Sequence, residues 1–106
     1  MKIAVSATGG SMSALVSEPF GRCAYFLIVD SETMKFEPVF NPAAGMTGGA
    51  GPEAVRVIAE KGAEVVLTGR VGPNAETALK SAGIRVAGGV SGSKTVRQAV
   101  DEYLKG

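Results

Sequence analysis

Short apolar runs and one turn signal predict a small sheet at the front of the chain. Residues 2–6 and 24–30 are mostly apolar, and the second run is rich in aromatic and β-branched side chains. Such runs are typical of buried strands. Ser31-Glu32-Thr33 predicts a turn, so residues 34–40 are expected to pair back as a hairpin. Pro38 predicts that this arm is an edge strand or carries a bulge, because proline has no backbone N–H to donate.

A different pattern, G-P-x-A-x-x-x-[I/L]-x-x-x-G-x-x-V, begins at Gly51 and again at Gly72. Proline at the first position of a helix costs nothing, since its missing N–H would be unpaired there. Gly62 and Gly83 stand where a helix ends in a left-handed residue. Each unit then runs into a short apolar segment, residues 64–68 or 84–87. A helix between two strands with short connections predicts parallel strands and right-handed crossovers.

The rest of the chain completes one α/β domain. We expect residues 7–21 to form a long loop with a helical turn near 13–16, and residues 41–51 to form a glycine-rich loop. A last helix is expected near Ser93, a candidate N-cap, because apolar residues recur on one side of it. The predicted fold for residues 1–106 is a mixed five-stranded sheet, with an antiparallel front, a parallel βαβα back and helices on its faces. Ligands favour the carboxyl ends of parallel strands, here loops 7–21, 69–72 and 88–92, which loop 41–51 is expected to join.

Composition excludes several classes of function. The sequence has no histidine and one cysteine, so histidine-based catalysis and a zinc site within one chain are ruled out. A net charge of +1 with both signs dispersed argues against binding nucleic acid by bulk electrostatics. No apolar run reaches the roughly 18 residues of a membrane span. We expect a cytoplasmic protein, because a lone cysteine fits a reducing compartment and a strand at Met1–Val5 leaves no room for a signal peptide.

Residues 88–95 nearly match a phosphate-binding loop. The pattern G-x-x-x-x-G-K-[ST] requires glycine directly before the lysine, and Ser93 stands before Lys94 here. Nucleotide hydrolysis is therefore not predicted. A glycine-rich loop that leads into a helix is the simpler interpretation, and a weak anion site there stays open because the N–H groups of a helix start are free donors.

Cys23 follows Arg22 and precedes the aromatic strand. A lone cysteine is usually a small buried hydrophobe. The alternative is a thiolate favoured by Arg22 that ligates a soft metal or an iron–sulfur cluster. One thiolate cannot hold a cluster alone. Ligation then requires a second subunit, an exogenous ligand, or retention that is mainly electrostatic, through Arg22, Arg70 and loop N–H groups.

Taken in order, several segments resemble the dinitrogenase iron–molybdenum cofactor biosynthesis family, whose members include nitrogenase cofactor carrier proteins. The matching segments are residues 1–5, residues 20–30 (FGRCAYFLIVD), Asn41-Pro42-Ala43, residues 48–51 (GGAG) and residues 69–83. Members often carry histidine before the Phe-Gly-Arg segment, and some carry it in the glycine loop. This chain has Pro19 at the first place and offers only Met46 in the second region.

The resemblance implies a ribonuclease-H-like three-layer fold and a non-enzymatic carrier or chaperone for an iron–sulfur or iron–molybdenum type cofactor or precursor. The cofactor-binding residues it suggests are Arg22, Cys23, Gly49, Gly51, Gly69 and Gly72, with Cys23 as the metal ligand. Expected partners are metal-cluster assembly proteins, with no nucleic acid and no membrane, and the chain is expected to be a monomer or a homodimer. The alternative is an adaptor or anion-binding module of the same fold without a cofactor. An enzyme is not expected, because no spacing in the sequence brings a nucleophile together with an activating partner.

Overall fold

Five strands form one mixed sheet in the order β3-β2-β1-β4-β5. The computed structural model describes all residues, 1–106. β1 pairs antiparallel with β2 and parallel with β4, so it is the central strand where the two halves of the sheet meet. The antiparallel front and parallel back predicted from the sequence are therefore confirmed. The strands are β1 (Lys2–Ala7), β2 (Tyr25–Asp30), β3 (Phe36–Phe40), β4 (Val65–Leu67) and β5 (Arg85–Ala87).

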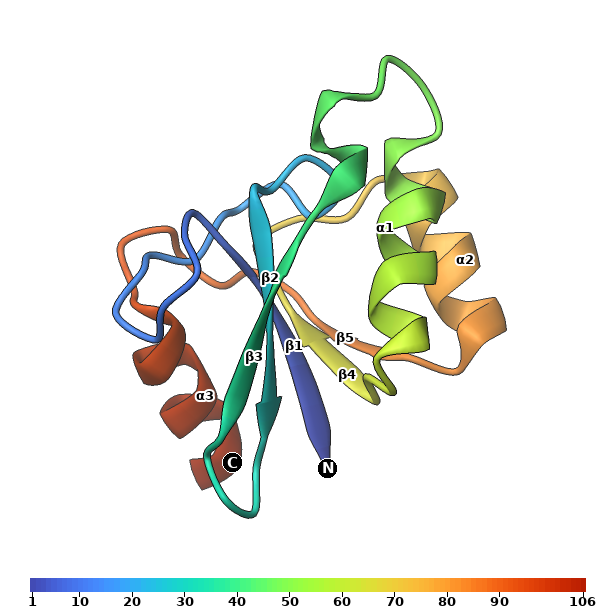
Figure 1. Ribbon diagram of the computed structural model, residues 1–106. Coiled ribbons are helices and arrows are strands. Elements are labelled where there is room, and N and C mark those ends of the chain that lie inside the picture. Colours follow the sequence, from blue (N-terminus) through green and yellow to red (C-terminus); the bar gives the residue numbers. More distant parts are fainter.

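Helices cover both faces of the sheet (Figure 1). α1 (Ala50–Glu60) and α2 (Pro73–Ala82) lie on one face, and α3 (Val96–Lys105) lies on the other. Alternation along the buried strands supplies both layers: Ala4 and Val66 pack in the α1/α2 core, whereas Ile3 and Val65 pack in the α3 core. Strands buried on both faces need continuous apolar runs, which is the pattern that residues 2–6 and 24–30 carry.

The hairpin arm β3 is an edge strand, as Pro38 predicted, although it begins at Phe36 rather than at residue 34. Asp30 N–H donates to the Lys35 carbonyl and Asn41 N–H donates to the Ala24 carbonyl, which fixes the alternation of bonded pairs between them. Pro38 lies opposite Leu27 and by that alternation belongs to a non-bonded pair. Its nitrogen therefore faces away from the sheet, and no ladder bond is lost.

The two Gly-Pro units build the parallel half, with one difference between them. Gly62 and Gly83 adopt φ of 81° and 73° after α1 and α2, which confirms them as left-handed stops. Pro73 is the first residue of α2, as predicted. Pro52, however, is the third residue of α1, because that helix already begins at Ala50. The helix therefore begins two residues earlier than predicted. Proline still fits there, because the N–H groups of the first three helical residues are all unpaired.

Three local predictions were wrong. Leu15 and Val16 lie in isolated β-bridges to Thr95 and Ala7, so residues 13–16 are not helical. Residues 41–51 are not all loop, since Pro42–Gly45 forms a short 3-10 helix, η1. The last helix is capped by Thr95 and not by Ser93.

Thr95 is the N-cap because it forms a capping box with Gln98. Its hydroxyl accepts from the Gln98 N–H at 3.1 Å, and the Gln98 side chain accepts from the Thr95 N–H at 2.9 Å. This reciprocal pair satisfies two donors at once. Ser93 instead hydrogen-bonds with Ser91 in the preceding loop.

Candidate functional site

The N-terminal ends of α1 and α2 converge on one hollow of about 240 Å³. The starts of α1 and α2 lie at the end of the sheet where the parallel strands finish, the end from which the loop between β3 and α1 projects (Figure 1). Four of the six residues suggested by the family resemblance line this hollow. The lining consists of Gly21 and Arg22 from the long first loop, residues 49–52 from the start of α1 and residues 72–75 from the start of α2. We call this the Arg22 hollow.

Two helix starts give the Arg22 hollow a set of free backbone donors. The N-caps are Gly49 and Gly72, and neither has a side chain to cap its helix. The first backbone bonds of the helices are donated by Glu53 and Glu76, back to Gly49 and Gly72. The N–H groups of residues 50 and 51 and of residues 74 and 75 consequently precede the helical ladder and have no protein acceptor. Such groups, with the positive end of each helix dipole, favour an anion.

Glycines at 21 and 51 allow this convergence. A Cβ on Gly51 would stand 2.8 Å from the Cβ of Ala75, so glycine there lets α1 meet α2. A Cβ on Gly21 would stand 3.1 Å from the Gly51 nitrogen. Side chains at either position would push the three segments apart. Gly51 was predicted as part of a ligand loop, but it lies in the first turn of α1, where it contributes close packing as well as an N–H group.

Arg22 supplies the positive charge at the rim of the hollow. Its guanidinium donates to the Met46 carbonyl, which ties the loop before α1 to the first loop of the chain. A guanidinium carries five N–H donors and stays protonated, so this one bond leaves most of its donors free. Arg22 therefore combines two roles: it orders the loop above the hollow, and it adds a permanent positive charge beside the free N–H groups.

Cys23 lies apart from the hollow. Only 1% of its surface is exposed, and it packs in the α1/α2 core with Phe20 and Phe26. Burial raises the pKa of its thiol to about 12, so at neutral pH the group is a thiol. Burial disfavours the thiolate that was expected beside Arg22. The two residues are neighbours in the chain, but Cys23 lies in the core and Arg22 lines the hollow. In the fold, no group of three or more His, Cys, Asp or Glu side chains is arranged to hold a metal ion.

Asn41 joins the segments of this region, although the sequence indicated it only as part of a matching segment and not for any role of its own. It is completely buried. Its amide donates to the carbonyls of Gly21 and Cys23 at 3.2 and 2.9 Å, and its side-chain oxygen accepts from the Ala43 N–H at 3.0 Å. Asn41 thus joins the Arg22–Cys23 segment to η1. An asparagine before a proline was the available signal, since it caps a turn by bonding two residues ahead.

Gly69, the remaining predicted residue, does not line the Arg22 hollow. A Cβ on Gly69 would stand 2.6 Å from the Cα of Glu18, so this glycine is explained by the close approach of two backbones. It lines a separate hollow of about 380 Å³ with Glu18, Arg70 and the loop after β5. Arg70 also lines a third hollow of about 250 Å³, which shares Gly21 and Gly72 with the Arg22 hollow. The three form a row along one end of the sheet, with Arg22 and Arg70 as its cations.

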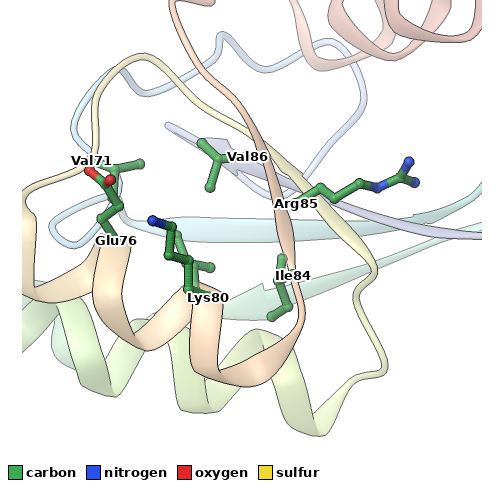
Figure 2. A pocket seen from close by; sticks show the side chains of 7 residues that line it. Val71, Glu76, Lys80, Ile84, Arg85 and Val86 are labelled. Atoms are coloured by element: carbon green, nitrogen blue, oxygen red, sulfur yellow. The ribbon is translucent and has the colours of Figure 1, made fainter.

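The largest cavity, of about 550 Å³, lies elsewhere, between α2 and the edge strand β5. Figure 2 shows Glu76 and Lys80 on α2 and, across from them, Ile84, Arg85 and Val86 along the segment that forms β5. Leu79 and Ile84 form an apolar floor. None of the six residues suggested by the resemblance lines it, and neither of the helix starts that line the Arg22 hollow reaches it.

Fold and site together define a small three-layer α/β domain with a row of hollows at the carboxyl ends of its parallel strands, of which the Arg22 hollow favours an anion. Residues 1–106 match the family described as dinitrogenase iron-molybdenum cofactor. The chain belongs to this family, as the resemblance indicated.

The solved structures that are similar to the chain include the following two. The apo form of the orange protein from Desulfovibrio gigas is 47% identical with a TM-score of 0.95, over 98% of this chain and 87% of that one. A putative NifB protein from Thermotoga is 36% identical with a TM-score of 0.85, over 99% of this chain and 88% of that one. No curated protein matches the sequence significantly. None of the helices combines the length and apolar character that crossing a bilayer requires.

Proposed function

We propose that the protein is a non-enzymatic carrier of an anionic metal–sulfur cluster, of the iron–sulfur or iron–molybdenum type, and that it holds this cargo at the Arg22 hollow. The single observation that carries the proposal is the convergence of two uncapped helix starts and Arg22 on one hollow. Membership of the dinitrogenase iron-molybdenum cofactor family supplies the class of cargo.

The donor set fits retention by charge and hydrogen bonds better than direct coordination. A cluster held by protein thiolates needs several of them, and the chain has one cysteine, which is buried as a thiol. Backbone N–H groups and a guanidinium, by contrast, are donors suited to the sulfur and oxygen atoms of an anion. Cys23 is therefore not required as a ligand in this proposal, and Arg22 and the starts of α1 and α2 would make the contacts.

Anaerobic reconstitution tests the proposal directly. The protein is supplied with molybdate and excess sulfide, with and without ferrous iron, desalted, and examined by absorption spectroscopy. We expect a protein-bound chromophore that Arg22→Ala weakens and that Cys23→Ala leaves in place. Arg97→Ala is the matched control, because Arg97 is an exposed arginine on α3, away from the hollow. Absence of any protein-bound chromophore would refute the proposal.

The salt dependence of the chromophore distinguishes charge-based retention from coordination by the Cys23 thiolate. Charge-based retention at an exposed site weakens as ionic strength rises, so we expect the chromophore to elute in about 1 M salt, where the screening length is about 3 Å. A chromophore that resists salt and disappears in Cys23→Ala would establish thiolate coordination instead.

A cofactor-free anion-binding or adaptor module is the second candidate, and the free N–H groups at the starts of α1 and α2 favour it, because they suit any anion. Thermal unfolding in the presence of phosphate compounds and of metal–sulfur reagents distinguishes the two. Stabilisation by phosphate compounds alone selects the second candidate. Stabilisation by thiomolybdate selects the carrier.

A further inference from the structure

Glu18 is held rigidly between the first loop of the chain and the parallel half of the sheet. Its backbone carbonyl accepts from the N–H groups of Gly69 and Arg70 at 3.1 and 2.8 Å. The next residue, Pro19, forms a bridge with Arg70. The backbone of Glu18 is therefore held in place relative to the loop after β4. This limits the positions that its carboxylate can reach.

The carboxylate of Glu18 lies against two groups of the kind that attract anions, a backbone N–H and a guanidinium. One oxygen accepts from the Gly92 N–H at 2.8 Å, within the glycine-rich loop that the sequence marked as a near phosphate-binding motif. The other oxygen lies 3.6 Å from the Arg70 guanidinium. Both side chains are largely open to solvent, at 47% for Glu18 and 72% for Arg70, so an anion in solution has access to the same donors.

We propose that Glu18 is an internal competitor that keeps anions away from Arg70 and the Gly92 N–H, and so sets the charge that this end of the sheet accepts. An incoming anion must displace the carboxylate or bind beside it. Either route weakens the binding of a small anion such as phosphate at Arg70, whereas a larger cargo can contact Arg22 as well as Arg70. The inference rests on the proposed function, because it assumes that a cargo held at the Arg22 hollow also reaches Arg70. The two arginines line adjoining hollows of one row.

The test is a titration with inorganic phosphate, followed by the backbone amide resonances of Arg70 and Gly92. Glu18→Gln removes the charge but keeps an oxygen that can accept from Gly92. We expect it to lower the phosphate Kd on the order of fivefold, which is what one unit charge about 4 Å away contributes in water. Glu37→Gln is the matched control, because Glu37 forms an exposed ion pair with Lys61 at 2.7 Å on a different part of the fold. It should leave the Kd unchanged.

Several outcomes would overturn the inference. One is a phosphate Kd in Glu18→Gln equal to that of the wild-type protein, and another is the absence of phosphate binding in both. A third is unfolding of both Glu18→Gln and Glu18→Ala, since Glu18 would then be structural. Phosphate titration needs no cluster, so its result is independent of the reconstitution experiment. A cluster that binds wild-type protein while Glu18→Gln leaves phosphate binding unaltered would refute this inference and leave the proposed function standing.

Discussion

Replacement of Gly69 by alanine should destabilise the protein although the new side chain is a single methyl group. That methyl would stand 2.6 Å from both the Cα and the Cβ of Glu18 and 2.8 Å from its carbonyl oxygen. Two of these three neighbours are backbone atoms, and the two segments are locked together by N–H bonds from Gly69 and Arg70 to that carbonyl. Relief therefore requires the first loop to move by about 1 Å, since carbon atoms at rest are about 3.5–4.0 Å apart.

Overpacking of this kind costs typically about 1–3 kcal/mol. For a domain of about this size, that corresponds to a fall in Tm of about 5–20 °C. Differential scanning calorimetry measures it. Gly48→Ala is the matched control, because no atom lies within 4 Å of a Cβ built at Gly48 and its φ is ordinary; its Tm should stay close to that of the wild type. A Gly69→Ala protein that melts with the control would refute the packing explanation.

Three further predictions concern capping, buried polar groups and pH. Thr95→Ala should lower stability by about 1 kcal/mol through loss of the N-cap, whereas Ser93→Ala should have a much smaller effect; thermal unfolding of the two variants decides. Asn41→Ala should cost about 1–3 kcal/mol, because the buried Cys23 carbonyl and Ala43 N–H lose their hydrogen-bond partner; urea unfolding measures this. For Cys23, burial raises the pKa of the folded thiol to about 12, whereas the pKa of an unfolded thiol is about 8.5. Stability should therefore fall as pH rises through this window, and the fall should be shallower in Cys23→Ala; an equally steep fall in both proteins would contradict the assigned burial.

Much of the fold could be predicted because the chain marks its elements locally. Glycine at the stops of α1 and α2, and proline at the start of α2, act within a few residues, so the two βα units were readable without tertiary information. The cap of α3 could have been read correctly as well. Gln98 lies three residues after Thr95 and completes a capping box, whereas Ser93 has Val96 at that position.

The site was less predictable because proximity in the chain does not decide burial. Arg22 and Cys23 are neighbours, yet one lines an open hollow and the other lies in the core. Gly69 and Gly72 looked equivalent in the sequence. Gly72 caps α2 with open space around it, whereas Gly69 makes room for the backbone of Glu18. These differences depend on segments about 50 residues apart in the chain that meet only after folding.

The two outer edges of the sheet bear on how the protein behaves when it is concentrated. An exposed strand edge can recruit another chain and begin aggregation. On β3, the central outward position is Pro38, which has no N–H to offer. β5 is three residues long; Arg85 N–H and the Ala87 carbonyl bond inward to Glu64 and Thr68, which leaves Val86 alone to present its backbone outward. Neither margin offers a continuous ladder for a second molecule, so the folded chain should resist edge-to-edge association, and any fibril it forms should begin from unfolded chains.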